Sequence, residues 1–263
     1  MNIALVGYGK MGKLLAARTR EQGHRIVMVI DPSVDGDAAV PGAEFCKTVA
    51  GAGNLAGADV ALEFTRPDTA AENITALAAR KIPVVSGTTG WYSRLAEVVR
   101  VVEDAGAALL WSPNFSLGVN LFYHIAAFAA KMFDPFPDYD VGGFEAHHNK
   151  KADSPSGTAK TLMEQVLAAM TRKKNTLYET LSVAPPPDAI HFASIRAGSL
   201  PGTHTLFFDS PADTIEITHT ARGRDGFAAG ALRAAEWLVN ASSSGKARVG
   251  VFTMNDVLAD ILA

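Results

Sequence analysis

The chain opens with Ile3-Ala4-Leu5-Val6-Gly7-Tyr8-Gly9-Lys10-Met11-Gly12, and this stretch decides the fold of its first half. The four apolar residues predict a short buried strand, and a helical pattern follows over residues 10–22. Three glycines with the spacing G-x-G-x-x-G join the two elements, which is the arrangement of a dinucleotide-binding turn. The sequence therefore predicts a Rossmann-like nucleotide domain at the start of the chain.

Each glycine has a physical role in such a turn. Gly7 permits the tight turn, Gly9 lets the backbone approach a pyrophosphate, and Gly12 allows the helix to pack closely on the strand. The amides at the start of the helix then face the phosphates. The alternative is a purely structural turn, because glycine turns are common. The predicted cofactor-binding turn comprises Gly7, Tyr8, Gly9, Lys10, Met11 and Gly12.

An acid follows the second predicted strand. Asp31 comes about 20 residues after the fingerprint, where a carboxylate binds the ribose 2′-hydroxyl of the cofactor. A carboxylate there repels a 2′-phosphate, which favours NADH over NADPH. Lys10 or Arg66 would still reach such a phosphate, so use of NADPH stays open. The alternative role for Asp31 is to cap a turn at the strand end.

Apolar runs alternate with helical patterns throughout the first half of the chain. Continuous apolar strands separated by helices indicate a parallel sheet covered on both faces. The predicted strands span residues 3–6, 26–30, 60–64, 82–86 and 108–111, and the helices span 10–22, 67–80 and 93–105. The stretch 49–58 is predicted to be a loop with a short helix.

The second half has a different pattern. Residues 191–196, 204–208 and 214–220 alternate with a period of two, which is typical of half-buried antiparallel strands. Helices are predicted at 120–132, 158–170 and 226–239, followed by a strand at 249–252 and a short helix. The fold class is therefore α/β, with a parallel nucleotide domain and a central α+β domain built on an open, mainly antiparallel sheet.

Composition excludes several classes of function. The 263 residues carry a formal net charge of −3, so nothing indicates a nucleic-acid partner. No apolar run approaches the length of a membrane span, and the first residues do not resemble a signal peptide. The one cysteine, Cys46, cannot form an internal disulfide. We expect a soluble, cytoplasmic protein.

The segment from Glu145 to Ala159 concentrates reactive side chains before a strong helical pattern. Two adjacent histidines, His147 and His148, are followed by Lys151, a cation. Ser156 is a natural helix N-cap, and the amides that follow it attract a carboxylate or phosphate. A proton donor, a cation and such a turn suit a small anionic substrate. The alternatives are a structural histidine and an ordinary capped helix.

A metal site is not expected in this segment. His147 and His148 point to opposite sides if the chain is extended there, which argues against two ligands to one metal. The chain also has no Cys/His cluster with the spacing of a zinc site. The prediction for metal ligands is none.

Two further loops follow predicted strands at their carboxyl ends, where ligands of parallel sheets bind. One loop spans residues 86–91 and the other spans 112–116. Their small and hydroxyl side chains suit close approach to a nicotinamide ring. Ordinary connecting loops are an equally good reading of the residues alone.

The string E-A-H-H-x-x-K-x-D-x-P-S-G-T-A at Glu145 to Ala159 resembles the signature of dihydrodipicolinate reductase, a family of the diaminopimelate route to lysine. The resemblance covers nearly the whole chain, although the glycine fingerprint is shared with many dehydrogenases. It also includes Glu63-Phe64-Thr65, Gly87-Thr88-Thr89-Gly90, Asn114-Phe115-Ser116, Gly118-Val119-Asn120, Phe252-Thr253-Met254 and Asp256-Val257-Leu258.

The resemblance implies a role for each matched position. His147 would be the acid/base, and Lys151 would bind a substrate carboxylate and assist proton delivery. The implied substrate contacts are His148, Ser156, Gly157 and Thr158. The implied cofactor contacts beyond the fingerprint are Phe64, Gly87, Thr88, Thr89, Ser112, Pro113, Asn114 and Phe115.

The resemblance also implies an architecture and a reaction. The dinucleotide-binding domain would span residues 1–117 and 225–263, and the substrate-binding and oligomerisation domain would span 118–224. The implied reaction is the NAD(P)H-dependent reduction of a small dicarboxylate cyclic imine, with domain closure in a homotetramer. Other hypotheses are a different two-domain NAD(P)-dependent amino-acid dehydrogenase, and a non-catalytic dinucleotide sensor that would lack the proton donor and the lysine.

The chain departs from the family pattern at three places. Glu63 replaces a more usual aspartate, and Asp31-Pro32 replaces the more usual Glu-Arg after the second strand. The second change is a further reason to expect a preference for NADH. Ala221-Arg222-Gly223-Arg224 replaces a more usual Ala-x-Ser-Arg stretch.

Overall fold

A computed structural model describes residues 1–33, 40–240 and 248–262. The chain divides into two compact units, the first comprising Met1–Ser116 and Asp225–Ala263 and the second comprising Leu117–Arg224. The ranges 34–39, 241–247 and 263, which belong to the predicted nucleotide domain, lie outside the described residues.

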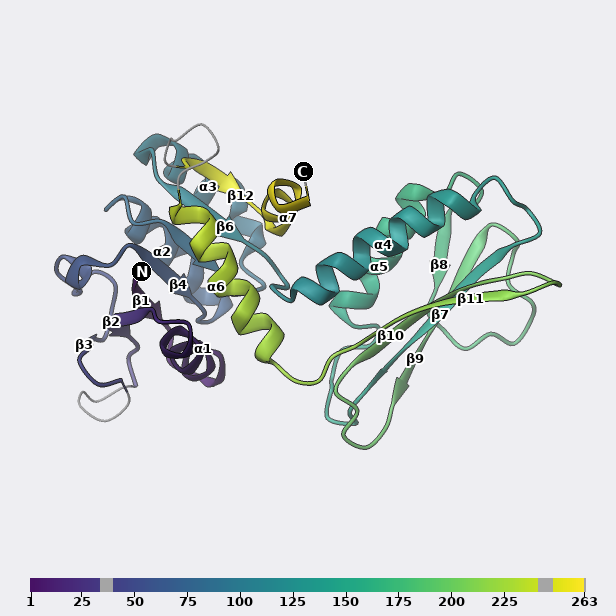
Figure 1. Cartoon of the computed structure of the whole chain (residues 1–263), viewed down its shortest axis with the longest axis horizontal. Helices are drawn as coiled ribbons and strands as arrows, with labels where there is room; N and C mark the ends of the chain where they lie inside the picture. Colours follow the sequence, from purple (N-terminus) through teal and green to yellow (C-terminus); the bar gives the residue numbers. More distant parts are fainter. Residues whose placement is uncertain (34–39, 241–247, 263) are drawn as a thin grey trace. The chain divides into compact units, whose positions relative to one another are not determined.

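The first unit contains a seven-stranded parallel sheet (Figure 1). Its strand order is β12-β6-β5-β4-β1-β2-β3, which contains the doubly wound order of a Rossmann fold. The strands are β1 (Asn2–Val6), β2 (Arg25–Ile30), β3 (Glu44–Cys46), β4 (Val60–Glu63), β5 (Val84–Ser86), β6 (Ala108–Trp111) and β12 (Gly250–Phe252). The predicted parallel nucleotide sheet is confirmed, with β3 as an additional strand.

Helices cover both faces of this sheet (Figure 1). Helix α1 (Lys10–Glu21) contacts α6 (Asp225–Val239), and α2 (Pro67–Ala78) contacts α3 (Leu95–Ala105). Val6, Ala61 and Val84 pack with the apolar face of α2 and α3, and the alternate residues of the same strands face the other way. Two 3₁₀ turns, η1 (Leu55–Gly57) and η2 (Tyr92–Arg94), and α7 (Met254–Leu262) complete the unit.

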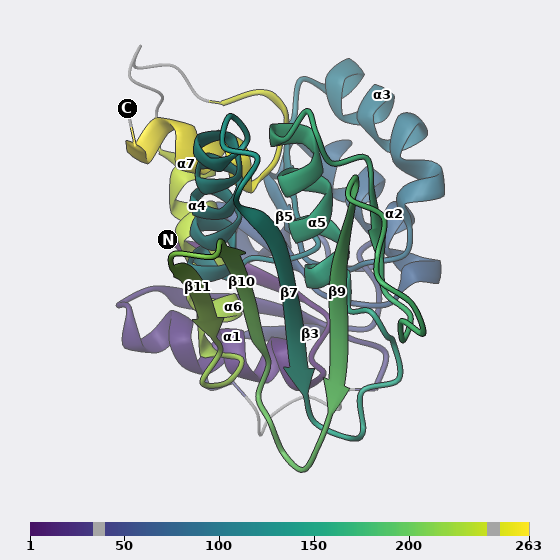
Figure 2. The same cartoon turned by 90° about the vertical axis from the view of Figure 1, so that its right-hand side faces the viewer.

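The second unit is a five-stranded sheet with α4 (Leu117–Phe133) and α5 (Gly157–Ala169) packed on one face, as Figure 2 shows. The strand order is β11-β10-β7-β9-β8. The strands are β7 (Asp140–His147), β8 (Asn175–Leu177), β9 (Ala189–Arg196), β10 (Thr203–Asp209) and β11 (Thr214–Thr220).

Pairing in the five-stranded sheet is mixed. Strand β10 is antiparallel to both β7 and β11, as the alternating pattern predicts, whereas β9 runs parallel to β7 and to β8. The expectation of a mainly antiparallel sheet is thus too simple. The reason is that β7 and β8 are separated by α5, a crossover that lets strands run parallel.

One face of this sheet changes character along its length. Val141, Phe192 and Leu206 belong to the apolar core beneath α4 and α5. The same face becomes polar four residues further along β7, two residues further along β9 and two residues back along β10, at Glu145, Ser194 and His204. These side chains share the face because side chains alternate between the two faces of a strand. The polar end of the face lies at the start of α5 and carries the site described next.

Candidate functional site

Four loops gather at the carboxyl edge of the parallel sheet. They begin at Gly7, Phe64, Gly87 and Ser112, and the amide of each of these residues donates to a carbonyl of the neighbouring strand at 2.8–3.2 Å. These loops carry the residues that the sequence predicts to bind the cofactor. The carboxyl edge of a doubly wound sheet is where such folds bind nucleotides.

The glycine turn has the geometry that the fingerprint predicts. Gly7 has a φ of 95°, and a Cβ at this position would lie 2.2 Å from the carbonyl oxygen of Phe64. A Cβ at Gly12 would lie 2.2 Å from the carbonyl oxygen of Gly7, so the helix packs too closely for any side chain. At Gly9 an added Cβ meets nothing within 4 Å, and this N-cap residue has no side-chain cap. The start of α1 therefore suits a pyrophosphate.

Asp31 is tied to the fingerprint turn. Its Oδ2 accepts a hydrogen bond from the amide of Tyr8 at 2.7 Å, and its Oδ1 accepts from the amide and hydroxyl of Ser33 at 2.8 and 2.5 Å. Burial opposes the charge, but the hydrogen bonds from Ser33 and Tyr8 outweigh it and lower the pKa of Asp31. The structure thus shows the turn-capping role, and an ionised carboxylate still has lone pairs for a ribose hydroxyl.

Buried Glu63 connects the loops that begin at Phe64 and Gly87. Its carboxyl group accepts hydrogen bonds from the hydroxyls of Ser86 at 2.6 Å, Thr88 at 3.1 Å and Thr65. The amide of Thr65 donates to Thr88 Oγ1 at 2.8 Å. Burial raises the pKa of Glu63 against the effect of these hydrogen bonds. The sequence analysis assigned Glu63 no role, because its partners come from another strand and loop.

Two aromatic rings connect the loops that begin at Phe64 and Ser112. The rings of Phe64 and Phe115 lie 5.9 Å apart, and a Cβ at Gly87 would lie 2.1 Å from the ring of Phe64. Ser112 donates its hydroxyl to the carbonyl of Asn114 at 2.8 Å, which closes a local turn. Among the other predicted cofactor residues, Met11 is half-buried and Lys10, Thr89 and Pro113 are exposed.

A second candidate site lies at the polar end of the five-stranded sheet. Strand register places Ser194 and His204 on either side of Glu145, and Arg196 beside His147. Register partners in a sheet project to the same face, so these five side chains from β7, β9 and β10 converge. The strands bring together residues that lie far apart in the sequence.

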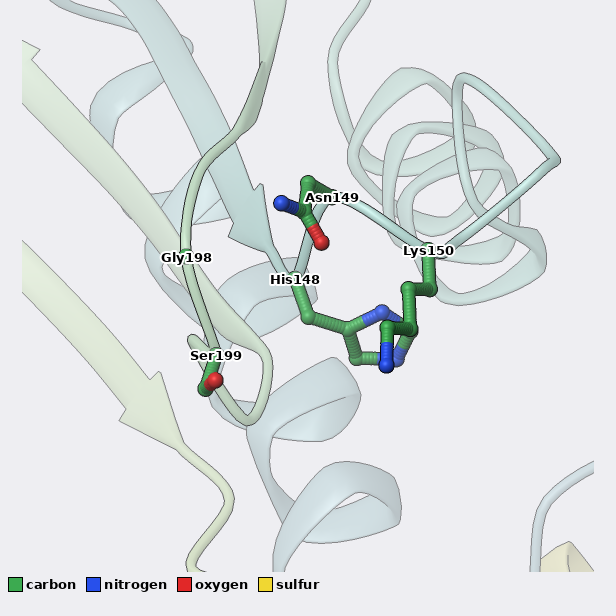
Figure 3. A pocket seen from close by; sticks show the side chains of 5 residues that line it. All are labelled: His148, Asn149, Lys150, Gly198 and Ser199. Carbon is green, nitrogen blue, oxygen red and sulfur yellow. The ribbon is translucent and has the colours of Figure 1, made fainter.

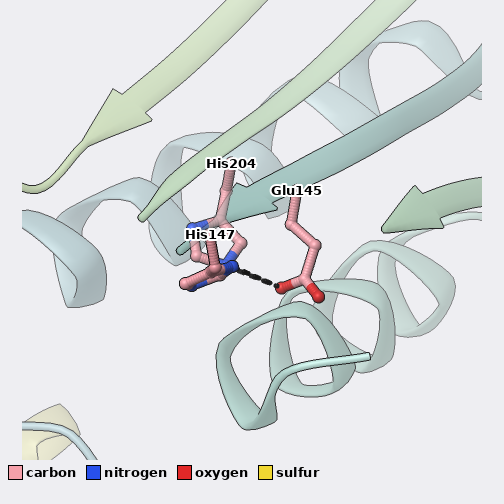
Figure 4. A group of neighbouring side chains, drawn as sticks. All are labelled: Glu145, His147 and His204. Atoms are coloured by element: carbon pink, nitrogen blue, oxygen red, sulfur yellow. Dashed lines mark ion pairs between the residues drawn. The ribbon is translucent and has the colours of Figure 1, made fainter. Parts of the chain in front are cut away.

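The carboxylate of Glu145 is the centre of this cluster. It is fully buried, and its Oε1 accepts from the amide of Ser156 at 3.0 Å, the hydroxyl of Ser194 at 2.9 Å and Nη2 of Arg196 at 2.8 Å. Its Oε2 lies 3.4 Å from Nδ1 of His147 and 3.4 Å from Nε2 of His204, as Figure 4 shows. Burial opposes the charge of Glu145, but these partners outweigh it and hold its pKa well below its usual range.

The environment of His147 favours the neutral imidazole. Burial is the largest effect and, with the nearby cations of Lys151 and Arg196 and the ring of His204, it lowers the pKa of His147 to about 4. The charge of Glu145 acts in the opposite direction. A dianionic substrate would add negative charge near this ring and raise its pKa, which is the direction a proton donor needs.

Three side chains of the cluster are spaced closely enough to be ligands of one metal ion. One ligand atom from each of Glu145, His147 and His204 lies within 4.8 Å of the others. The Arg196 guanidinium, hydrogen-bonded to the same carboxylate, opposes a dication at this point. We therefore assign no metal to these residues.

The predicted anion-binding turn begins α5. Ser156 is the N-cap, and its Oγ accepts from the amide of Ala159 at 3.1 Å. Lys151 Nζ lies 2.8 Å from Oδ1 of Asp153, which also accepts a hydrogen bond from the backbone of Gly157. The structure thus brings the lysine and the helix start to the same carboxylate. Gly157 is exposed, and Thr158 is partly exposed.

The side chain of His148 does not join the cluster around Glu145. It lines a cavity of about 450 Å³ together with Asn149, Lys150, Gly198 and Ser199, as Figure 3 shows. The amide of Asn149 donates to the carbonyl of Gly198 at 3.3 Å, which joins two of the lining segments. Of the predicted substrate residues, His148 is the one that lines it.

Ser194, Arg196 and His204 were not predicted from the sequence as site residues, and Glu145 had no predicted role. Ser194 and Arg196 lie in a predicted strand, as does His204, and their polar side chains interrupt the buried positions of an alternating pattern. Those interruptions were the available signal. Register decides which polar residues meet, and the sequence alone does not give it.

The fold and these two sites define a class of protein. The first unit is a Rossmann-type dinucleotide-binding domain, and the second carries a buried Glu-His-Arg cluster beside a lysine. The first half, residues 1–115, matches the family model described as dihydrodipicolinate reductase, N-terminus, and residues 118–258 match the model described as dihydrodipicolinate reductase, C-terminus. The chain belongs to the dihydrodipicolinate reductase family.

Relatives support this assignment over nearly the full length. The chain is 39% identical to a 4-hydroxy-tetrahydrodipicolinate reductase of Christiangramia forsetii, over 99% of each chain. It is 36% identical to the enzyme of the same name from Chromobacterium violaceum, over 98% of each. A structure of dipicolinate-bound dihydrodipicolinate reductase from Paenisporosarcina sp. TG-14 shares the fold, with a TM-score of 0.77 and 21% identity over 96% of this chain and 97% of that one.

A more distant neighbour shares the architecture only. An amine dehydrogenase from Mycobacterium smegmatis superposes with a TM-score of 0.62 at 13% identity, over 91% of this chain and 93% of that one. The hypotheses of a different amino-acid dehydrogenase or a dinucleotide sensor are not favoured, since both halves match the reductase family. No helix in the described part of the chain is long and apolar enough to span a membrane.

Proposed function

We propose that the chain catalyses the reaction for which its relatives are named, the NAD(P)H-dependent reduction of 4-hydroxy-tetrahydrodipicolinate to tetrahydrodipicolinate in lysine biosynthesis. The observation that carries this proposal is the buried cluster around Glu145 and His147, placed beside Lys151 at the start of α5. A nucleotide-binding protein without catalytic function has no need of such a cluster.

The nicotinamide cofactor, when bound, supplies the hydride. Its pyrophosphate would be held by the amides at the start of α1, where Gly9 leaves open space. The rings of Phe64 and Phe115 lie at the same edge of the sheet, and Gly87 packs against the ring of Phe64. A hydrogen bond from the hydroxyl of Thr88 to Glu63 holds Thr88 there. These residues bind and orient, and they bring no acid or base of their own to the reaction.

A preference for NADH over NADPH is part of the proposal. Asp31 is held ionised at the fingerprint by Tyr8 and Ser33, so its charge would repel a 2′-phosphate. Initial rates with the two cofactors at matched concentrations test this. A clear preference for NADPH would contradict it.

The substrate class follows from charge. A cyclic imine with two carboxylates needs cationic and amide partners, and Lys151, His148 and the amides of Gly157 and Thr158 would supply them. The reaction adds one hydride and one proton across the conjugated ring, after the 4-hydroxy compound has lost water. His147 would deliver the proton to the carbon next to the one that accepts hydride, which restores the C=N bond.

The test is a coupled assay. The substrate is unstable, so it is made fresh by the synthase that condenses pyruvate with aspartate semialdehyde, and oxidation of NADH is followed at once. Turnover that depends on the synthase product supports the proposal. NADH binding without turnover would favour a dinucleotide sensor, and turnover with other amino-acid substrates would favour another dehydrogenase.

The two units would have separate roles. We propose that the first binds the dinucleotide and that the second binds substrate and forms a homotetramer. Apolar residues on the outer side of α4, with Phe128 66% exposed, form what we name the α4 stripe: Leu121, Ile125, Phe128 and Met132. Ile195, 47% exposed, lies on the sheet face opposite the helices. The α4 stripe suits a contact between copies of the chain, and the exposed Ile195 lies on another face, where a tetramer of D₂ symmetry could make a second contact.

A cytoplasmic location is also proposed. Cys46 is free, and no disulfide contributes to the fold of the described residues. A reducing compartment fits a free cysteine and a fold without disulfides, and the cytoplasm also contains NADH. Fractionation of cells that express the chain would test the location.

A further inference from the structure

The two carboxylate oxygens of Glu145 have different surroundings. Three donors hold Oε1, namely the amide of Ser156, the hydroxyl of Ser194 and the guanidinium of Arg196, at 2.8–3.0 Å. They come from α5 and β9, so the carboxylate is fixed from two elements. Its other oxygen, Oε2, is buried and faces two histidine rings.

The ring of His147 has a defined orientation relative to this carboxylate. Nδ1 lies 3.4 Å from Oε2, and neither atom has a hydrogen-bond partner among the described residues. Catalytic hydrogen bonds often form or tighten only when a ligand binds. The other ring nitrogen, Nε2, lies on the side of Gly202, where an added Cβ would come within 3.2 Å of it. Gly202 therefore leaves the Nε2 edge uncrowded.

We infer that Glu145 is a positioning residue for His147. Its carboxylate, held by Arg196, keeps the neutral imidazole in the tautomer with a proton on Nδ1 and leaves Nε2 to exchange a proton with substrate. The inference rests on the proposed role of His147. The physical reason is that an ionised carboxylate only accepts hydrogen bonds, so the ring nitrogen that faces it must donate.

The charges around His147 show what Glu145 contributes. Lys151 faces the ring from the loop after β7, Arg196 from β9 and His204 from β10, and all three disfavour a second positive charge. Glu145, on β7 itself, is the group that favours the protonated ring. Without its charge, protonation of His147 during turnover becomes harder. The alkaline limb of the kcat profile should then move to lower pH.

Glu145→Gln gives a sharp test, because the contacts of Oε1 fix how the new amide must lie. Its carbonyl oxygen would stay with the three donors, and its NH₂ group would face Nδ1 of His147. Nδ1 must then accept a hydrogen bond, so the proton of the ring moves to Nε2. The substitution therefore reverses the tautomer while it keeps size and shape.

The experiment combines side-chain ¹H–¹⁵N NMR with kinetics on the EDTA-treated full chain, with His147 assigned by comparison with His147→Gln. We expect Nδ1–H in the wild type and Nε2–H in Glu145→Gln. We also expect kcat to fall at least tenfold, which is less than the about 100- to 10,000-fold that a positioned proton transfer contributes, because His147 itself remains. The alkaline limb should shift to lower pH, and the affinity for NADH should not change.

Glu216→Gln is the matched control. It makes the same substitution at an exposed position of β11 outside the cluster, so the Nδ1–H tautomer and the pH profile should persist. An Nε2–H tautomer in the wild type would overturn the inference even if Glu145→Gln fails to fold. An unchanged tautomer and pH limb in a folded Glu145→Gln would also overturn it. Absence of turnover in the wild type would instead contradict the proposed function and leave the tautomer measurement valid.

Discussion

The carboxylate of Asp153 lies 2.8 Å from the ammonium of Lys151, so the cation assigned to the substrate is already paired within the chain. Asp153 also accepts a hydrogen bond from the backbone of Gly157, and the hydrogen bond from Lys151 lowers its pKa. A lysine and a helix-start amide are the partners that we propose for a substrate carboxylate. Asp153 thus occupies the position of a competing ligand.

Removal of this competitor should strengthen binding of a dicarboxylate. We expect Asp153→Asn to lower the Kd for dipicolinate about two- to five-fold, since an exposed ion pair is worth up to ~1 kcal/mol. Calorimetric titration measures it. Asp138→Asn makes the same charge change at another exposed position and should have no effect. Weaker binding by Asp153→Asn would show that Asp153 orients Lys151 instead of competing for it.

Loss of the proton donor or the cation should reduce turnover without loss of the cofactor. We expect His147→Gln and Lys151→Ala each to lower kcat by about 100- to 10,000-fold. NADH affinity, measured by fluorescence titration, should hardly change, because the fingerprint lies in the other unit. Lys160→Ala removes an exposed lysine of α5 and should keep full activity. Near-normal turnover in both variants would remove the roles that we assign to them.

The first unit was largely predictable because its strands are continuous apolar runs joined by strong helical patterns. Strand β7 was not predicted, although it is the central strand of the second unit, because Gly142 and Gly143 weaken its pattern. A Cβ at Gly142 would lie 2.7 Å from the ring of Phe207, and a Cβ at Gly143 would lie 2.9 Å from that of Phe192. At Gly143 the carbonyl oxygen of Thr205 would lie closer still, at 2.4 Å. The glycines are required by atoms of neighbouring strands, which a local pattern does not reveal.

Strands β3 and β8 were missed for a different reason. Each has three residues, too few for a period to be recognised, and each lies at a sheet edge. In the site, His147 and Lys151 were found because they are close together in the sequence. Arg196 and His204 join them only through the register of three strands.

The buried carboxyl group of Glu63 should make stability depend on pH. Burial raises its pKa above the ordinary value of 4.5, so the folded chain holds this proton more tightly than the unfolded chain. The contribution of protonated Glu63 to the free energy of unfolding is complete below pH 4.5, and it is lost as the pH rises through the pKa of Glu63 in the folded chain. Glu63→Gln should therefore flatten this decline.

Urea denaturation from pH 4.5 to pH 8.5 measures the effect, with the wild type expected to lose stability relative to Glu63→Gln as the pH rises, by up to ~1.4 kcal/mol per pH unit. Glu103→Gln changes an exposed carboxylate of α3 and should follow the wild type. Parallel curves for the wild type and Glu63→Gln would show that Glu63 is ionised in the folded chain across this range.

The charge of Asp31 should set the cofactor preference. In the wild type the Tyr8 amide donates to Oδ2 of Asp31 at 2.7 Å. Asp31→Asn keeps a side-chain oxygen that can accept this hydrogen bond, and it removes the negative charge. We expect the ratio of kcat/KM for NADPH to that for NADH to rise about tenfold, which corresponds to ~1.4 kcal/mol. The change should appear mainly in KM for NADPH. An unchanged ratio would mean that Asp31 only caps the turn.

The α4 stripe should be needed for assembly. Phe128 is 66% exposed in the single chain and lies on α4 among Leu121, Ile125 and Met132, an arrangement that water disfavours and a second copy would cover. Phe128→Glu places a charge in that contact, and sedimentation velocity should show a smaller species than the tetramer that we propose for the wild type. Val183→Glu, at a position 77% exposed and outside the stripe, should leave the mass unchanged. A wild-type monomer would contradict the tetramer itself. A tetramer that survives Phe128→Glu would contradict a role of the α4 stripe in assembly.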